Sequence, residues 1–320
     1  MLWMAARRLV SGMATLFVCS VLIFLACNLL PGDVALAVLG KNATPERVAQ
    51  VEHALGLDQS FLSRYLDWIG GLFSGDLGQS SAALVQGSDP SISSQFLPAL
   101  ANSMTLAAVT LIVLVPVAMT LGIFAGSHEG KVGDHATSAG ALLLGSLPEF
   151  VLGAVMILVF FQWLGWLPPV SLLPPGDSAL SHPDILVLPV LTLLGVSVAG
   201  AARQIRAGVI ETRKQDYVTL AQLNGLPRPT VAQRYTLRNA TAPAVQVIAQ
   251  TAQYLIGGII IVEGVFNYPG VGQYLINAVT VRDVPVIQTV AVVLAAIFIL
   301  INVVADLVVV ALVPALRTGR

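Results

Sequence analysis

Charged side chains are scarce in this sequence of 320 residues, which holds only 16 lysines and arginines and 17 aspartates and glutamates. Soluble domains are about 25% charged, whereas the charged fraction here is 10%. So few charges cannot cover a water-soluble surface, which excludes an ordinary cytosolic enzyme. The 56% of hydrophobic residues also excludes an intrinsically disordered chain. A bilayer core about 30 Å thick takes about 20 apolar residues per helix, so the chain is long enough for six or more spans.

The residues that usually carry chemistry are equally sparse. The two cysteines, Cys19 and Cys27, lie in one apolar run about 12 Å apart along a helix, too far for a disulfide. The stretch from Gly126 to Val132 lacks the spacing of a phosphate-binding loop and the Ser or Thr after its lysine. The four histidines show no metal-ligand spacing. We therefore expect no catalytic residue, no metal and no cofactor in this chain.

Long runs without charge dominate what is present. Six of them predict six membrane-spanning helices, at residues 9–30, 99–126, about 136–167, 185–202, 239–262 and 284–316. The first run is longer than the roughly 7–15 apolar residues of a signal peptide, which favours a span that stays in the membrane. The fold class expected is thus an all-α integral membrane protein.

The basic residues fix the orientation of these spans. If both termini lie on one side, that side receives twelve of the 16 basic residues: Arg7, Arg8, Lys131, Arg203, Arg206, Arg213, Lys214, Arg228, Arg234, Arg238, Arg317 and Arg320. The other side receives Lys41, Arg47, Arg64 and Arg282. Basic residues concentrate on the cytoplasmic side of membrane proteins, so we expect cytoplasmic N- and C-termini.

This orientation divides the chain into a first span at 1–30, an external segment at 31–98 and a five-helix core at 99–320. The external segment predicts one helix capped by Thr44 and closed by Gly56. A second helix is predicted from about Ser60, and its aromatic stripe suits either the headgroup layer or packing against the spans. The stripe consists of Phe61, Leu62, Tyr65, Ile69, Leu72 and Phe73, with Trp68 beside it.

A cytoplasmic loop at about 206–238 predicts a helix, a sharp break and a second helix. The first helix places four side chains three to four residues apart: Tyr217, Leu220, Ala221 and Asn224. Gly225 stands where a left-handed residue ends a helix, and two prolines, Pro227 and Pro229, prevent simple continuation. Small Ala221 permits close approach of another backbone. The loop is either a handle for a soluble partner or an interfacial helix anchored to anionic lipid.

Three acids lie within or at the ends of predicted spans, where ionisable groups are costly and often functional. Glu149, next to Pro148, either lines a translocation path and meets a substrate amino group or pairs with a neighbouring span. Glu263 is expected at the external interface, where water relieves the cost of its charge. Asp306 is expected in the cytoplasmic half of the last span, where an arginine of the loop can pair with it.

The run from Asp216 to Leu226, followed by Arg234 to Ala240, resembles the "EAA" coupling loop of ABC importer permeases. It is most similar to the first of the two permease subunits of dipeptide and oligopeptide transporters. Further matches follow in order along the chain: Leu30-Pro31-Gly32-Asp33, Leu55-Gly56-Leu57-Asp58, the run from Gly75 to Ser80, Ser146-Leu147-Pro148, Val262-Glu263, Phe266, Tyr268 to Gly272, and Arg282 to Val286. Two positions depart from the family pattern, namely Tyr235 in place of the usual His and Val313-Pro314-Ala315 in place of Asp-Pro-Arg.

The resemblance implies a multi-pass subunit of the bacterial inner membrane. Its implied partners are a second homologous permease, two cytoplasmic ATPase subunits that bind ATP and Mg, an external substrate-binding protein and membrane lipid, with no nucleic acid. The implied ATPase-contacting residues are Asp216, Tyr217, Ala221, Asn224, Gly225, Leu226 and Arg234. The implied solutes are dipeptides, oligopeptides, nickel chelates, glutathione or haem.

Two other classes of function remain to be weighed. An ion-coupled transporter or channel acting without an ATPase would be expected to show internal repeats with broken helices, or paired intramembrane charges. Neither is evident in the sequence. A purely structural membrane protein is the third possibility, and the ordered cytoplasmic loop argues against it.

Overall fold

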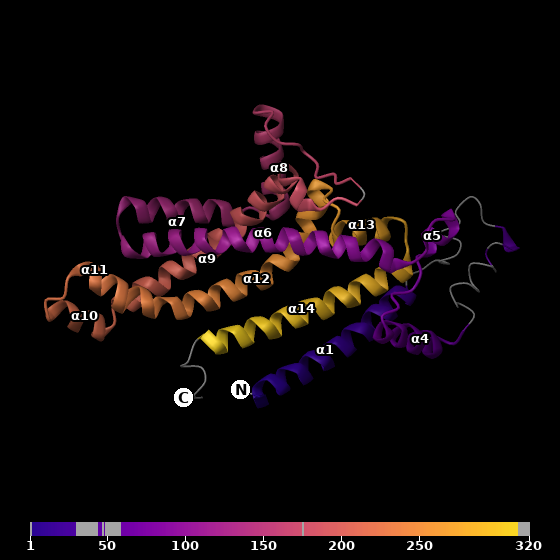
Figure 1. Ribbon diagram of the computed structural model, residues 1–320, viewed down its shortest axis with the longest axis horizontal. Helices are drawn as coiled ribbons and strands as arrows, with labels where there is room; N and C mark the ends of the chain where they lie inside the picture. The colour runs from indigo at the N-terminus through magenta and orange to yellow at the C-terminus, as the bar shows by residue number, and fades with distance from the viewer. Residues whose placement is uncertain (1, 30–43, 47, 49–58, 175, 313–320) are drawn as a thin grey trace. The chain divides into compact units, whose positions relative to one another are not determined.

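A computed structural model describes residues 2–29, 44–46, 48, 59–174 and 176–312 of the chain (Figure 1). Nearly all regular structure within these residues is helical, and one isolated antiparallel bridge pairs Gln79 with Ser91. The predicted all-α class is confirmed. Most of the helix predicted between Thr44 and Gly56 lies outside the described residues, as does the Val313-Pro314-Ala315 departure.

Five described helices are long and apolar enough to cross a membrane. They are α1 (Leu2–Leu29), α6 (Ile92–Ser127), α9 (Pro183–Arg213), α12 (Arg238–Phe266) and α14 (Val284–Leu312). Four of them extend beyond their predicted bounds. α1 begins at Leu2 rather than at residue 9, and α6 begins at Ile92 rather than at residue 99. α9 continues to Arg213 rather than ending at 202, and α12 continues to Phe266 rather than ending at 262. A sixth span is present only if a bent pair of shorter helices counts as one.

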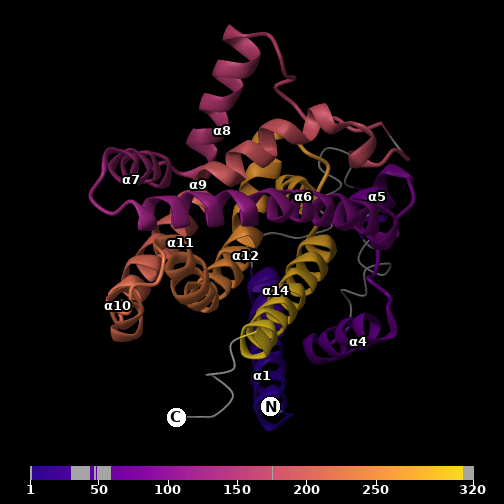
Figure 2. The ribbon, with the colours of Figure 1, turned by 60° about the vertical axis from the view of Figure 1, so that its left-hand side comes forward.

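That bent pair replaces the single helix predicted at about 136–167. α7 (Val132–Gly145) and α8 (Glu149–Ile157), the latter continued by a π-helical turn η2 (Leu158–Trp163), meet at an angle of 100°. Pro148 stands at the junction in an extended conformation, with ψ of 149°. Proline has no N–H for the preceding turn and its ring clashes with that turn, so the helix ends before Pro148. Figure 2 shows α8 leaving α7 at a steep angle.

The helices fall into two compact units. The central unit contains Met104–Tyr268 together with the residues from Ile301 onward, and the N-terminal unit contains Leu2–Ser103 and Pro269–Leu300. Two helices, α6 and α14, run from one unit into the other.

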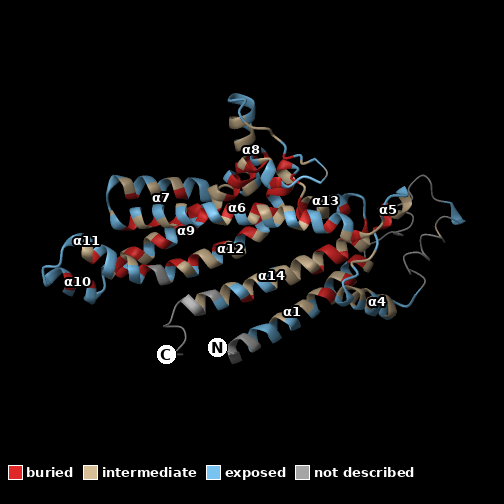
Figure 3. Ribbon diagram, in the orientation of Figure 1, coloured by how far each residue is buried: buried red, intermediate tan, exposed pale blue. Residues whose placement is uncertain are grey.

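The central unit is organised around α9. In its most apolar stretch, 61% of α9 is buried, against 28% or 33% for α6 and α12, and Figure 3 shows the many buried positions along it. α9 packs against α7, α8 and α12. The largest apolar cluster of the unit includes Leu106, Leu114, Leu188, Leu193, Leu255 and Phe266. Its burial packs α6, α9 and α12 together within this unit.

The N-terminal unit shows where the aromatic stripe of the second external helix goes. α4 (Phe61–Ser74) packs Phe61, Tyr65 and Trp68 around Phe24 of α1, with ring centroids 5.0, 5.3 and 5.6 Å from the Phe24 ring. Trp68 also donates a 3.1 Å hydrogen bond from Nε1 to the Thr289 hydroxyl on α14. Of the two interpretations of this stripe, packing against the spans is therefore correct for these three aromatics.

A buried carboxylate joins two external segments of the same unit. Asp283 is 2% exposed and precedes α14. It accepts hydrogen bonds from the residues that begin α5 (Ser81–Gln86), namely from the Ser80 and Ser81 hydroxyls and from the Ser81 and Ala82 amides. Burial and the nearby Asp283 charge raise the pKa of Tyr274, in α13 (Val271–Thr280), to about 12. Two short motifs noted separately in the sequence therefore meet here.

Candidate coupling loop and membrane cavity

The cytoplasmic loop has the predicted order of helix, break and helix. α10 (Asp216–Leu223) follows α9 after only Lys214 and Gln215. Gly225 then takes a left-handed conformation with φ of 74°, as predicted, which costs other L-residues about 1–2 kcal/mol. A short helix α11 (Arg228–Thr230) and a π-helical turn η4 (Val231–Leu237) lead directly into α12.

A small apolar core holds the two arms of the loop together. Val218, Ala221 and Val231 are 1%, 4% and 4% exposed and form one cluster, against which Tyr235 packs. The close approach that Ala221 permits is therefore to η4 of the same chain. Tyr235, the departure from the family pattern, serves as part of this internal core.

The other predicted loop residues lie on the exposed side. Tyr217, Leu220 and Leu223 are 41%, 59% and 79% exposed, which leaves an apolar surface on α10. The remaining predicted residues are also exposed: Asp216, Asn224, Gly225, Leu226 and Arg234. Exposed apolar surface rimmed by polar residues is typical of a protein interaction site. Of the predicted coupling residues, only Ala221 is buried and therefore unable to touch a partner.

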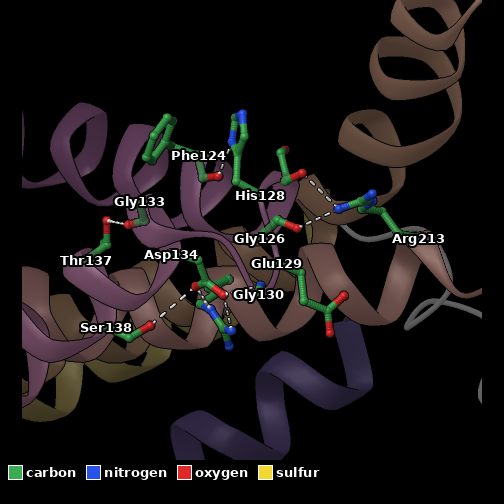
Figure 4. A network of polar contacts seen from close by, with 12 residues as sticks. Phe124, Gly126, His128, Glu129, Gly130, Gly133, Asp134, Thr137, Ser138 and Arg213 are labelled. Carbon is green, nitrogen blue, oxygen red and sulfur yellow. Dashed lines mark hydrogen bonds and ion pairs between the residues drawn. The ribbon is translucent and has the colours of Figure 1, made fainter.

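An ion pair that was not predicted from the sequence lies at the base of this loop (Figure 4). Asp134, 1% exposed at the start of α7, receives hydrogen bonds from Nε and Nη2 of Arg206 on α9, the latter at 2.7 Å. The Gly130 amide and, more weakly, the Ser138 hydroxyl also donate to it, at 2.9 and 3.4 Å. These hydrogen bonds and the Arg206 charge compensate the free-energy cost of removing the Asp134 carboxylate from water.

Glu149 lies at the beginning of α8 and is half-buried. The hydroxyl of Tyr254 on α12 donates a hydrogen bond to its Oε1 atom. Tyr254 stands at the middle of the apolar stretch Pro243–Phe266, yet 53% of it is exposed. The sequence predicted Glu149 but not Tyr254, because a lone tyrosine in an apolar run carries no pattern of its own.

Tyr254 also lines a cavity of about 340 Å³ between α9 and α12. The other polar residues of its wall are Ser197, Arg203, Gln204, Gln250 and Thr251. The Ser197 hydroxyl is buried and has no hydrogen-bond partner among the described residues. The volume lies in the range of small-molecule sites, roughly 300–1,000 Å³. Polar groups that line a cavity between membrane helices can form hydrogen bonds with water or with a solute.

The other two intramembrane acids differ in their surroundings. Glu263 is completely buried, with 0% exposure, so the expectation that it lies at a water-exposed interface is wrong. It lies in the last turn of α12, close in sequence to Phe266 and Tyr268, both also 0% exposed. Asp306 is half-buried in α14, and its pairing with an arginine of the loop stays a prediction. Across the described residues, no group of three His, Cys, Asp or Glu side chains could hold a metal ion.

Membrane helices, a structured loop between α9 and α12 and a polar cavity are features of membrane transport components. Comparison with known proteins specifies the class. Residues 118–318 match the family described as binding-protein-dependent transport system inner membrane component, and residues 1–108 match the N-terminal family of the same membrane components. The chain belongs to this family and is a multi-pass protein of the bacterial inner membrane.

Individual relatives agree over almost the whole chain. The chain is 36% identical over 311 residues to the glutathione transport system permease protein GsiC of Escherichia coli O6:H1, covering 97% of each protein. The identity is 35%, with the same coverage, to the proteins of that name from Escherichia coli K12 and Shigella dysenteriae serotype 1. The chain is thus a permease subunit of an importer that works with a binding protein.

Proposed function

We propose that this chain forms one half of a translocation path, with a second homologous permease as the other half. The observation that supports this most directly is the polar, exposed face of α9 and α12. Arg203, Gln204, Gln250 and Tyr254 are all exposed on helices that cross the membrane. Amide and phenol side chains such as those of Gln250 and Tyr254 are unfavourable in contact with lipid. This face therefore meets a protein partner and a hydrated path.

The cytoplasmic loop is the proposed contact with one of two ATPase subunits, which hold ATP and Mg. The exposed surface of α10, with Tyr217, Leu220 and Leu223, provides the apolar part of the contact. Asp216, Asn224, Gly225, Leu226 and Arg234 surround it. The buried cluster of Val218, Ala221 and Val231 keeps this surface rigid, so a force applied to α10 is passed on rather than absorbed.

Glu149 is the proposed contact with the solute in the path. Its carboxylate is an acceptor that suits an ammonium group, and the Tyr254 hydroxyl fixes its position. The guanidinium of Arg203 and the amides of Gln204 and Gln250 on the cavity wall suit a carboxylate and peptide groups. The proposed solutes are glutathione or other small peptides, delivered by an external binding protein. The named relatives, which carry glutathione, support this choice.

Reconstitution of the whole importer in proteoliposomes tests the proposal. Both permeases, the ATPase subunits and the binding protein are combined, and uptake of labelled glutathione and of small peptides is measured. We expect uptake that requires both ATP on the ATPase side and the binding protein. Uptake by this chain without the ATPase subunits, driven by an ion gradient, would instead establish an ion-coupled transporter.

A further inference from the structure

The buried Asp134–Arg206 pair lies between the loop and the rest of the central unit. Asp134 is at the first turn of α7, whereas Arg206 is near the cytoplasmic end of α9, 72 positions later in the chain. The guanidinium uses two nitrogens on two carboxylate oxygens, a geometry that fixes orientation as well as distance. The pair thus ties the cytoplasmic end of α9 to the hairpin formed by α6 and α7.

The contact between α9 and the α6–α7 hairpin is packed too closely for the helices to slide past each other. A Cβ atom added at Gly122 of α6 would lie 2.7 Å from the Ile205 side chain, and one at Gly126 would lie 2.8 Å from that of Val209. Arg213, the last residue of α9, donates from Nη1 to the carbonyl oxygens of Gly126 and Ser127, both at 3.0 Å. Since interiors packed at this density transmit displacement, α9 and the hairpin form one rigid element here.

This element connects two functional regions. On its cytoplasmic side, α9 continues into α10 through two residues whose amides bond back to it, Lys214 to Glu211 and Gln215 to Thr212, both at 3.2 Å. On the membrane side, α7 extends for 14 residues, about 21 Å, and ends at Gly145, just before the turn that holds Glu149. The ion pair therefore lies at one end of α7, and the Glu149–Tyr254 contact lies just beyond the other.

We infer that Asp134 and Arg206 are positioning residues for energy coupling. They join α9 to the α6–α7 hairpin, so that a displacement of α10 also moves α7. The far end of α7, at Gly145, then moves the turn that leads to Glu149. Without the pair, α10 still moves with ATP hydrolysis, but less of that movement reaches the cavity. The inference rests on the proposed function, because it requires an ATPase to act on α10.

The variant D134N removes the charge and keeps the size of the side chain and an acceptor for the Gly130 amide. In the reconstituted importer we expect ATP hydrolysis to persist while the amount of solute taken up per ATP falls about fivefold or more. A merely structural role would lower assembly, hydrolysis and uptake together and leave their ratio unchanged. An unchanged ratio in assembled D134N importer would overturn the inference.

An exposed ion pair between the same hairpin and the end of α9 supplies a matched control. Glu129 and Lys214 are 3.1 Å apart but 41% and 66% exposed, and exposed pairs contribute little. We expect E129Q to keep the wild-type ratio of uptake to hydrolysis. A fall as large as in D134N would show that the buried pair has no special role.

A chemical cross-link between α9 and the hairpin tests the inference even if D134N fails to assemble. Glu129→Cys and Lys214→Cys, in a background with Cys19→Ala and Cys27→Ala, can be joined by a short bifunctional maleimide. If α9 and the hairpin move as one body, the cross-linked importer transports at the rate of the same variant before cross-linking. Transport that stops on cross-linking would overturn the inference. Failure of the proposed function is distinguished because the wild-type importer then shows no ATP-dependent uptake.

Discussion

The Ser81 hydroxyl donates a 2.9 Å hydrogen bond to the carboxylate of Asp283, which follows it by 202 positions in the chain. The carboxylate also receives the amides of Ser81 and Ala82, at 3.1 and 3.2 Å. One acid thus satisfies the free N–H groups at the start of α5 and holds that helix against the beginning of α14. The contact connects α5, a helix of only 6 residues, to the residue that precedes α14.

Replacement of Asp283 by alanine should destabilise the protein. The change leaves buried hydroxyl and amide donors without an acceptor, at a cost of about 3 kcal/mol. Asp67→Ala is the control, since Asp67 is exposed on α4 of the same unit. Thermal unfolding of the purified permease in detergent should show a lower Tm for Asp283→Ala alone, and equal Tm values for the two variants would contradict this assignment.

Local features of the fold could be predicted, because each depends on a few neighbouring residues. Gly225 ends the first arm of the loop in the predicted left-handed conformation. The third apolar run, by contrast, breaks at Pro148. The break itself was not predicted, since a proline inside a membrane helix is often tolerated, as it is at Pro243 in α12. Local chemistry identifies such a residue without deciding how far the chain turns there.

Contacts between distant residues could not be predicted from one sequence. Arg206 lies 72 positions from Asp134, and Tyr254 lies 105 positions from Glu149. Hydrophobic periodicity places each residue on a helix but does not choose the helix that faces it. Glu263 illustrates the same limit, because its position at the end of a span suggested water, whereas its exposure in the folded chain is 0%.

The exposed surface of α10 should be required for binding of the ATPase. Leu223→Asp places a charge on a side chain that is 79% exposed, so the loop keeps its fold while the apolar contact is lost. We expect less ATPase to copurify with this variant. Val132→Asp is the matched control, because Val132 is 84% exposed at the first position of α7, outside α10. Equal recovery of ATPase with both variants would argue against docking at α10.

Ala221→Asp tests a different property of the same loop. Ala221 is 4% exposed within the cluster of Val218 and Val231, so an aspartate there separates α10 from η4. We expect normal insertion into the membrane, loss of substrate-stimulated ATP hydrolysis and faster proteolysis of the loop. Intact stimulation with a protease-resistant loop would show that this internal core does not matter for coupling.

The conformation at Gly225 should be needed for stimulation as well. Gly225→Pro fixes φ near −65°, far from the observed 74°, and removes the amide that donates to the Gln222 carbonyl at 3.0 Å. The chain should still insert, but the importer should lose substrate-stimulated ATP hydrolysis. Gly140→Ala is the control, since a Cβ atom at Gly140 would meet nothing within 4 Å. Normal stimulation by the proline variant would refute the prediction.

Uptake should depend on the Glu149 carboxylate and on the tyrosine that positions it. Glu149→Gln removes the charge that suits an ammonium group, and we expect uptake to fall about tenfold or more, because charge-assisted hydrogen bonds are worth about 1.5–3 kcal/mol. Tyr254→Phe removes only the hydroxyl that donates to Glu149, so its loss of uptake should be smaller. Glu211→Gln, at an exposed acid near the end of α9, should have no effect. Because all three variants keep the volume of the side chain almost unchanged, a graded loss distinguishes a charge effect from repacking, and uptake unchanged by Glu149→Gln would exclude Glu149 from the path.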